Sequence, residues 1–108
     1  MKLPTEVFGD VVVVHTPEEL SSDTAGQLEG FLTSLERSNV IVDLDGSETI
    51  DGTGLEALLG AQESLRALNG DLKLSTGNPA NRKILEITRL DQQLEVFDTV
   101  IDAVKSFA

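Results

Sequence analysis

The sequence predicts a single α/β domain built on a mixed β-sheet of about four or five strands. Two β-rich runs, Glu6–Phe8 and Val11–His15, are joined by Gly9-Asp10, which is typical of an antiparallel hairpin. A buried strand at 40–44 follows a helical segment, so it should pair in parallel with an earlier strand through a right-handed crossover. With 108 residues, 40% of them hydrophobic, the chain is long enough for one core, and we expect residues 1–108 to form one domain.

Two helices are expected between the hairpin and the next strand. Thr16-Pro17-Glu18-Glu19 combines a capping residue, a proline at the first helical position and a glutamate three residues on, which predicts a short helix. Ser21-Ser22-Asp23 offers a second helix start. Apolar residues then recur at helical spacing up to Ser38-Asn39, and they should pack on the sheet: Ala25, Leu28, Phe31, Leu32 and Leu35.

The stretch from Val40 to Leu55 is the centre of the predicted structure. Val40–Leu44 is apolar and rich in β-branched residues, as expected for a strand covered by neighbours. After a short polar crossing, Asp51-Gly52-Thr53-Gly54 opens the longest helical pattern in the chain. The packed side of this helix should carry Leu55, Leu58, Leu59, Ala61, Gln62, Leu65 and Leu68, and the exposed side Glu56, Gly60, Glu63 and Ala67.

The last third of the chain predicts a strand, a helix, an edge strand and a terminal helix. Asn69-Gly70-Asp71 should end the preceding helix with its glycine at the C′ position, and Leu72–Ser75 should be the next strand. Asn78-Pro79 supplies an N-cap and a first helical residue. Leu94–Phe97 should be a short edge strand, and Asp98 should cap a terminal helix that points Val100, Ile101 and Val104 inward.

Composition excludes several classes of partner. The formal net charge of -11 would repel nucleic acid and anionic lipid surfaces, and the low aromatic content disfavours stacking on bases. A basic protein surface is the natural complement, although acidity also keeps a protein soluble. The chain has no cysteine, and we find neither a signal peptide nor a membrane-spanning segment, so we expect a cytoplasmic protein.

Thr53 and Asp51 are the candidate functional residues at the start of the long helix. Thr53 lies between two glycines, where the free amides of a helix N-terminus favour an anion. It is therefore either a phosphoacceptor or simply the helix N-cap. Asp51 is expected either to position a hydroxyl or a metal during phosphoryl transfer, or to order the turn by bonding nearby backbone amides.

Other polar positions favour structural roles. Asp43 and Asp45 could mimic half of a metal site, but two carboxylates at a strand end are more often solvated, and His15 is expected at the surface. Gly60 costs about 1 kcal/mol inside a helix, which indicates close approach of either a partner backbone, our preferred explanation, or a neighbouring helix. No nucleophile, base and orienting group can be assembled, and no phosphate-binding loop is present, so we expect neither an enzyme nor a cofactor or metal.

These elements together resemble the STAS domain, which occurs in bacterial anti-sigma factor antagonists and in the cytosolic tails of sulfate transporters. The resemblance spans nearly the whole chain. It rests on the ordered set Val40-Ile41-Val42-Asp43-Leu44, Ile50-Asp51-Gly52-Thr53-Gly54-Leu55 with its leucine-rich helix, Asn78-Pro79, Ile84-Leu85, Leu90 and Val96-Phe97-Asp98.

The resemblance implies a mixed sheet with helices mainly on one side and a role in protein binding. Family antagonists bind an anti-sigma factor that is often a serine kinase, and phosphorylation by that kinase ends the binding. The usual acceptor is a Ser or Thr directly after the Asp. Here Gly52 stands at that position and cannot accept a phosphate, so the remaining hydroxyl is that of Thr53; Glu56 also stands where the family tends to have glycine.

We therefore expect an anti-sigma factor antagonist-like module whose partner is an anti-sigma factor or serine-protein kinase. The expected binding surface is the loop and helix from 51 to 63, with these residues in contact: Asp51, Gly52, Thr53, Gly54, Glu56, Gly60 and Glu63. The alternative is a non-phosphorylated STAS accessory subunit of an ABC-type lipid transporter or of a larger signalling complex.

Overall fold

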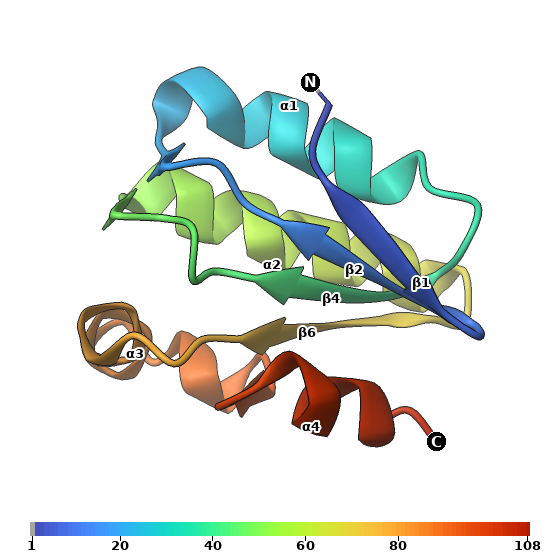
Figure 1. The fold of residues 1–108 in the computed structure, drawn as a ribbon. Coiled ribbons are helices and arrows are strands. Elements are labelled where there is room, and N and C mark those ends of the chain that lie inside the picture. The colour runs from blue at the N-terminus through green and yellow to red at the C-terminus, as the bar shows by residue number, and fades with distance from the viewer. Residues whose placement is uncertain (1) are drawn as a thin grey trace.

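A five-stranded mixed sheet, in the order β1-β2-β4-β6-β7, organises the chain (Figure 1). The computed structural model describes residues 2–108. The strands of this sheet are β1 (Thr5–Phe8), β2 (Val11–His15), β4 (Asn39–Asp43), β6 (Asp71–Ser75) and β7 (Val96–Phe97). A separate parallel pair is formed by β3 (Glu19–Leu20) and β5 (Thr49–Ile50). The helices are α1 (Ser22–Thr33), α2 (Gly52–Ala67), α3 (Pro79–Ile87), a 3₁₀ turn at Leu90–Gln92 and α4 (Val100–Lys105).

The pairing of the strands confirms the predicted mixed sheet. Only β1 runs antiparallel to its neighbour β2, while β2, β4, β6 and β7 are parallel. Gly9 lies in the hairpin turn with φ of 60°, in the left-handed region that its lack of a Cβ makes accessible. The local turn signal therefore sets the register of the first two strands.

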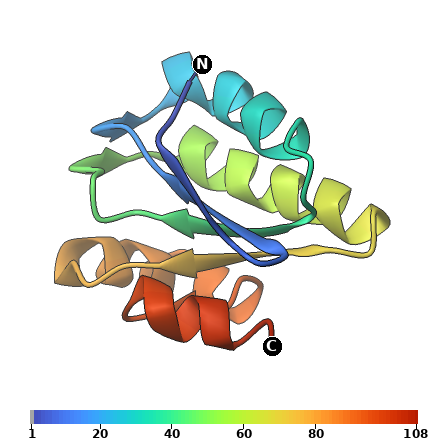
Figure 2. The ribbon, with the colours of Figure 1, turned by 45° about the vertical axis from the view of Figure 1, so that its right-hand side comes forward.

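The helices form two layers of unequal size (Figures 1 and 2). The larger core lies between the sheet and the face covered by α1 and α2, and Leu85 of α3 joins it. The smaller core lies on the opposite face, where Ala103 of α4 packs with Val11, Val13 and Ile41. Both faces of β2 and β4 are thus buried, which explains their uninterrupted apolar sequences.

The predicted short helix at 16–19 is wrong. Thr16 is buried, and its side chain is hydrogen-bonded to Ser47 (Oγ1 to Oγ, 2.6 Å) instead of capping a helix. Glu19–Leu20 is extended and pairs in parallel with Thr49–Ile50. A local capping motif is outweighed here by pairing with a segment thirty residues later.

Helix α1 begins as expected but ends earlier than predicted. Ser21 and Thr24 form a reciprocal capping box at its start. The helix stops at Thr33, and the amide of Ser34 bonds to the carbonyls of Gly30 and Phe31. Residues 34–38 are then free to turn the chain into β4.

The ends of α2 and α4 differ in detail from the sequence expectation. Asn69, with φ of 65°, takes the left-handed position after α2, while Gly70 lies so close to the Ser38 backbone that a side chain would collide with it. Thr99, rather than Asp98, caps α4 by accepting a hydrogen bond from the Asp102 amide. Two aliphatic side chains predicted to face inward, Leu68 and Ile101, are exposed.

The helices within residues 2–108 are those of a globular domain in length and polarity. None of the helices there is both long and apolar enough to cross a membrane.

Candidate functional site

The turn that opens α2 is organised by Asp51. This residue is the helix N-cap, and its Oδ1 accepts a hydrogen bond from the Gly54 amide at 3.0 Å. The Thr53 hydroxyl donates to the same oxygen at 2.7 Å. Asp51 therefore orders the turn, as one of the two alternatives predicted, whereas the prediction of Thr53 as N-cap is wrong.

The carboxylate of Asp51 is stabilised in its charged form. The hydrogen bond from the Thr53 hydroxyl, and next that from the Gly54 amide, lower the pKa of Asp51 below its ordinary value of 3.8. Asp51 is thus ionised at neutral pH. Thr53 itself is exposed, so the turn presents a solvent-accessible hydroxyl whose proton is directed at a carboxylate.

The two glycines that flank Thr53 have different surroundings. A Cβ built on Gly52 would meet no atom within 4 Å, so this position is open. A Cβ on Gly54 would lie 2.7 Å from the carbonyl oxygen of Leu20 in β3. Gly54 is buried and permits close packing of α2 on β3, which removes it from the exposed part of the predicted binding surface.

Gly60 lies beneath a side chain of the neighbouring helix. A Cβ at this position would lie 2.5 Å from Oε1 of Glu29, whose side chain reaches over α2 from α1. The space above Gly60 is therefore occupied by the end of a flexible Glu29 side chain, which can shift and does not by itself require glycine, so the approach of a partner backbone stays a prediction. Glu56 and Glu63, in contrast, are exposed on α2 as predicted.

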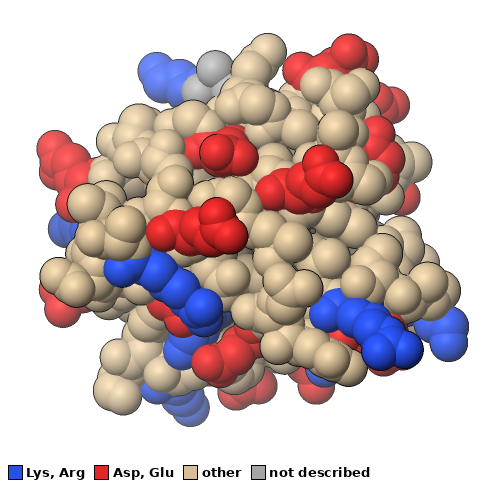
Figure 3. All heavy atoms as spheres, turned by 180° about the vertical axis from the view of Figure 1, so that it is seen from behind, with Lys and Arg blue, Asp and Glu red and all other residues tan. Residues whose placement is uncertain are grey.

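Acidic side chains surround this part of the molecule. Asp51, which caps α2, and Glu56 and Glu63 on the exposed side of that helix form no ion pair with a Lys, Arg or His among residues 2–108. On the side of the molecule opposite to the view of Figure 1, acidic groups predominate above, and most Lys and Arg side chains lie below (Figure 3). The predicted surface is thus a negatively charged one.

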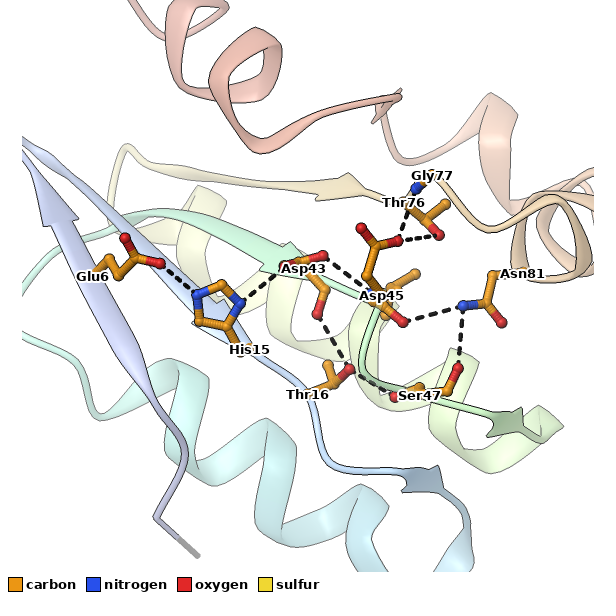
Figure 4. Close-up of polar contacts among 10 residues, drawn as sticks. Glu6, His15, Thr16, Asp43, Asp45, Ser47, Thr76, Gly77 and Asn81 are labelled. Carbon is orange, nitrogen blue, oxygen red and sulfur yellow. Dashed lines mark hydrogen bonds and ion pairs between the residues drawn. The ribbon is translucent and has the colours of Figure 1, made fainter.

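A buried polar network fixes the loop that leads to the turn (Figure 4). The Asn81 side-chain amide, from α3, donates to the carbonyls of Leu44 and Ser47 at 3.1 and 3.3 Å. The Ser47 hydroxyl in turn contacts Thr16 and donates to the Pro17 carbonyl. Sequence reasoning missed Ser47 and Asn81, because their partners lie some thirty or more residues away and nothing in the local pattern marks them.

The turn itself is attached to this framework by β3 and β5. Glu19 and Leu20 of β3 pair with Thr49 and Ile50 of β5. Asp51 follows Ile50 directly, and its amide donates to the Leu20 carbonyl at 2.9 Å. Leu20 is fully buried in the larger core. The start of α2 is consequently held at a fixed position relative to the sheet.

Asp45 is exposed, as predicted, whereas Asp43 is half-buried and paired, so its predicted solvation is wrong. Asp43 Oδ2 is paired with Nδ1 of His15 at 2.8 Å, and Asp45 Oδ1 accepts hydrogen bonds from Thr76 and from the Gly77 amide (Figure 4). Both carboxylates therefore connect neighbouring segments at the carboxyl end of the sheet. Among residues 2–108, no group of three or more His, Cys, Asp or Glu side chains is placed to hold a metal ion.

Comparison with known proteins gives one consistent family. The family model described as STAS domain matches residues 2–103. A Thermotoga neapolitana protein named as an anti-sigma factor antagonist homologue is 23% identical over 106 residues, which is 94% of each chain.

Solved structures share the fold. An anti-sigma factor antagonist from Mycobacterium paratuberculosis superposes with a TM-score of 0.84 and 25% identity over 97% of this chain and 92% of that one. The anti-sigma factor antagonist SpoIIAA in its unphosphorylated form superposes with a TM-score of 0.79 and 19% identity over 98% of this chain and 96% of that one. The phosphorylated form of SpoIIAA from Bacillus superposes with a TM-score of 0.72 and 20% identity over 99% of this chain and 100% of that one.

Proposed function

Because this chain belongs to the STAS domain family, we propose that it is an anti-sigma factor antagonist-like module that binds a partner protein through the start of α2. The observation that supports this most is the Asp51-capped turn, which presents the Thr53 hydroxyl to solvent on a rigid base. The relatives named as anti-sigma factor antagonists cover almost the whole chain. The proposed partner is an anti-sigma factor or serine-protein kinase, which would place the interaction in the cytoplasm.

The docking surface consists of the exposed residues of the predicted site: Asp51, Gly52, Thr53, Glu56 and Glu63. Gly54 is buried against Leu20 and lies outside this surface, and Gly60 lies beneath the Glu29 side chain. The exposed acidic groups complement a partner face rich in Lys or Arg. Gly52 adds a flat position without a side chain, which allows close approach of the partner backbone.

A phosphate on Thr53 would act as the switch of this surface. It would add a charge of about −1.5 to −2 beside Asp51 and one helical turn from Glu56. Forming the phosphoester removes the hydroxyl proton, so the hydrogen bond from Thr53 to Asp51 would be lost. Repulsion from Asp51 and the dense negative charge would then change what the surface binds while the buried framework stays in place.

Incubation with the partner kinase and ATP tests the switch. We expect a mass gain of one phosphate, mapped to Thr53 by fragmentation, and no gain in the matched variant Thr53→Val, which keeps the shape of the side chain. A native protein that gains no phosphate would remove the switch but leave partner binding, which is measured separately by titration calorimetry.

Substitution of the exposed glutamates tests the docking surface. Glu56→Ala with Glu63→Ala should weaken partner binding several-fold, because attraction to a basic face is lost, and should leave the melting temperature nearly unchanged. Glu86→Ala, an exposed site on α3, is the matched control and should retain affinity. Equal loss of affinity in all variants, or loss of folding, would count against this surface.

One observation favours the alternative function. The residue directly after Asp51 is Gly52, which has no hydroxyl to phosphorylate. A STAS subunit that is never phosphorylated needs no hydroxyl at this position. Such a subunit would serve an ABC-type lipid transporter or a larger signalling complex. An affinity pull-down distinguishes the two: a kinase-like partner supports the antagonist function, and a transporter ATPase supports the accessory subunit.

A further inference from the structure

A single histidine joins three strands at the antiparallel edge of the sheet. His15, on β2, contacts Oε1 of Glu6 on β1 through Nε2 at 2.7 Å and Oδ2 of Asp43 on β4 through Nδ1 at 2.8 Å (Figure 4). His15 is the only histidine of the chain. The function proposed above uses none of these three residues.

The two carboxylates depend on His15 for a positive charge. Within residues 2–108, no Lys or Arg forms an ion pair with Glu6 or Asp43. The charged groups that contact the ring are Glu6 from β1 and Asp43 from β4. Among the described residues, no charged side chain of α4 forms an ion pair with His15. The other oxygen of Asp43 accepts the Asp45 amide. A protonated ring donates to both acids at once, whereas a neutral ring has one N–H and can donate to only one.

Strand β1 has few other attachments. All of its four residues are exposed, including Val7 and Phe8 at 54% and 42%. It is an edge strand of the sheet and pairs only with β2. The side-chain bridge from Glu6 through His15 therefore supplements a strand held mainly by backbone pairing.

We propose that His15 is a proton-controlled clamp on the edge of the sheet: with a proton it ties β1 to β4 across β2, and without one it lets β1 open. Opening exposes the backbone N–H and C=O groups of β2 along one side. Such an unpaired row is a template for pairing with another strand.

The direction of the pH dependence follows from the surroundings of the ring. Burial lowers the pKa of His15, but the hydrogen bonds to Glu6 and Asp43, with the charges of both acids, outweigh burial and raise it above 6.5. A pKa raised by the closed strand means that the proton stabilises closure. This stabilisation is complete below the pKa of the open form and is lost as the pH rises through the higher pKa of the closed form.

Amide hydrogen exchange of two adjacent residues tests the clamp. The His15 amide donates to the Pro4 carbonyl at 3.0 Å and reports β1 opening, while the Thr16 amide donates to the Asp43 carbonyl at 3.1 Å and reports the β2–β4 pairing. After correction for intrinsic exchange, the opening constant at His15 relative to Thr16 should rise between about pH 5.5 and 8.5. Each unit by which the pKa falls on opening corresponds to about a tenfold rise.

Two variants decide whether His15 is responsible. In His15→Gln, which keeps a polar amide but cannot titrate in this range, the ratio should not change with pH. In Glu6→Gln the ratio should change less, and the ring resonances should titrate at lower pH. A constant ratio in the native protein, or an equal change in His15→Gln, would refute the clamp.

Discussion

Replacing Gly54 with alanine should destabilise the domain by about 1–3 kcal/mol, whereas the same change at Gly52 should be neutral or stabilise it by up to about 1 kcal/mol. The new methyl group at Gly54 would be forced against the Leu20 carbonyl, 2.7 Å away, and backbone atoms cannot move aside cheaply. At Gly52 the methyl group enters open space, and alanine is the better helix former.

Urea denaturation of the two variants measures this difference. Both changes add one methyl group to the same helix turn, so each is the control for the other. Partner binding by Gly54→Ala should be assayed below its own melting transition, since a shifted α2 also moves Thr53. Similar unfolding free energies for the two variants would show that the Leu20 backbone in β3 can move away from α2 to accommodate the methyl group. That result would contradict a rigid turn.

Removing the side-chain amide of Asn81 should also destabilise the domain, by about 1–3 kcal/mol. Asn81→Ala leaves the carbonyls of Leu44 and Ser47 without this donor in a buried site, and the small alanine also leaves a void. The loop from 44 to 50 should exchange its amides faster as a result. The turn at Asp51 lies directly after this loop and should become more mobile with it.

Asn78→Ala is the matched control for Asn81→Ala. Asn78 precedes α3 and also carries a side-chain amide, but its Oδ1 caps the helix by accepting a hydrogen bond from the Ala80 amide. Its loss should cost about 1 kcal/mol and leave exchange in residues 44–50 unchanged. Faster exchange of the loop in both variants would show that α3 as a whole, rather than the Asn81 bonds, holds the loop.

Local signals were sufficient for most of the fold. The Gly9 turn, the proline after Asn78 and the apolar strand predicted at 40–44 each carry their structural reason within a few residues. Each element is present, and the strand spans Asn39–Asp43. The motif at 16–19 is equally convincing locally, yet it is wrong because Thr16 and Leu20 gain more from partners in the 47–50 segment. No pattern within the motif contains that information.

The candidate site shows the same division. The start of α2 and the exposure of Thr53, Glu56 and Glu63 follow from helical spacing, and the structure agrees. The roles of Gly54 and Gly60 depend on Leu20 and on Glu29, which lie more than thirty residues earlier. The pairing of His15 with Asp43, 28 residues apart, is likewise a product of the parallel register between β2 and β4.

The exposure of Glu56 and Glu63 has a consequence for the speed of recognition. Charges in solvent act over roughly the Debye length, about 8 Å at physiological ionic strength, and added salt shortens that range. Such charges guide diffusional encounter more than they lengthen the life of the complex. Raising the salt concentration should therefore slow the arrival of a basic partner while its rate of departure stays nearly constant.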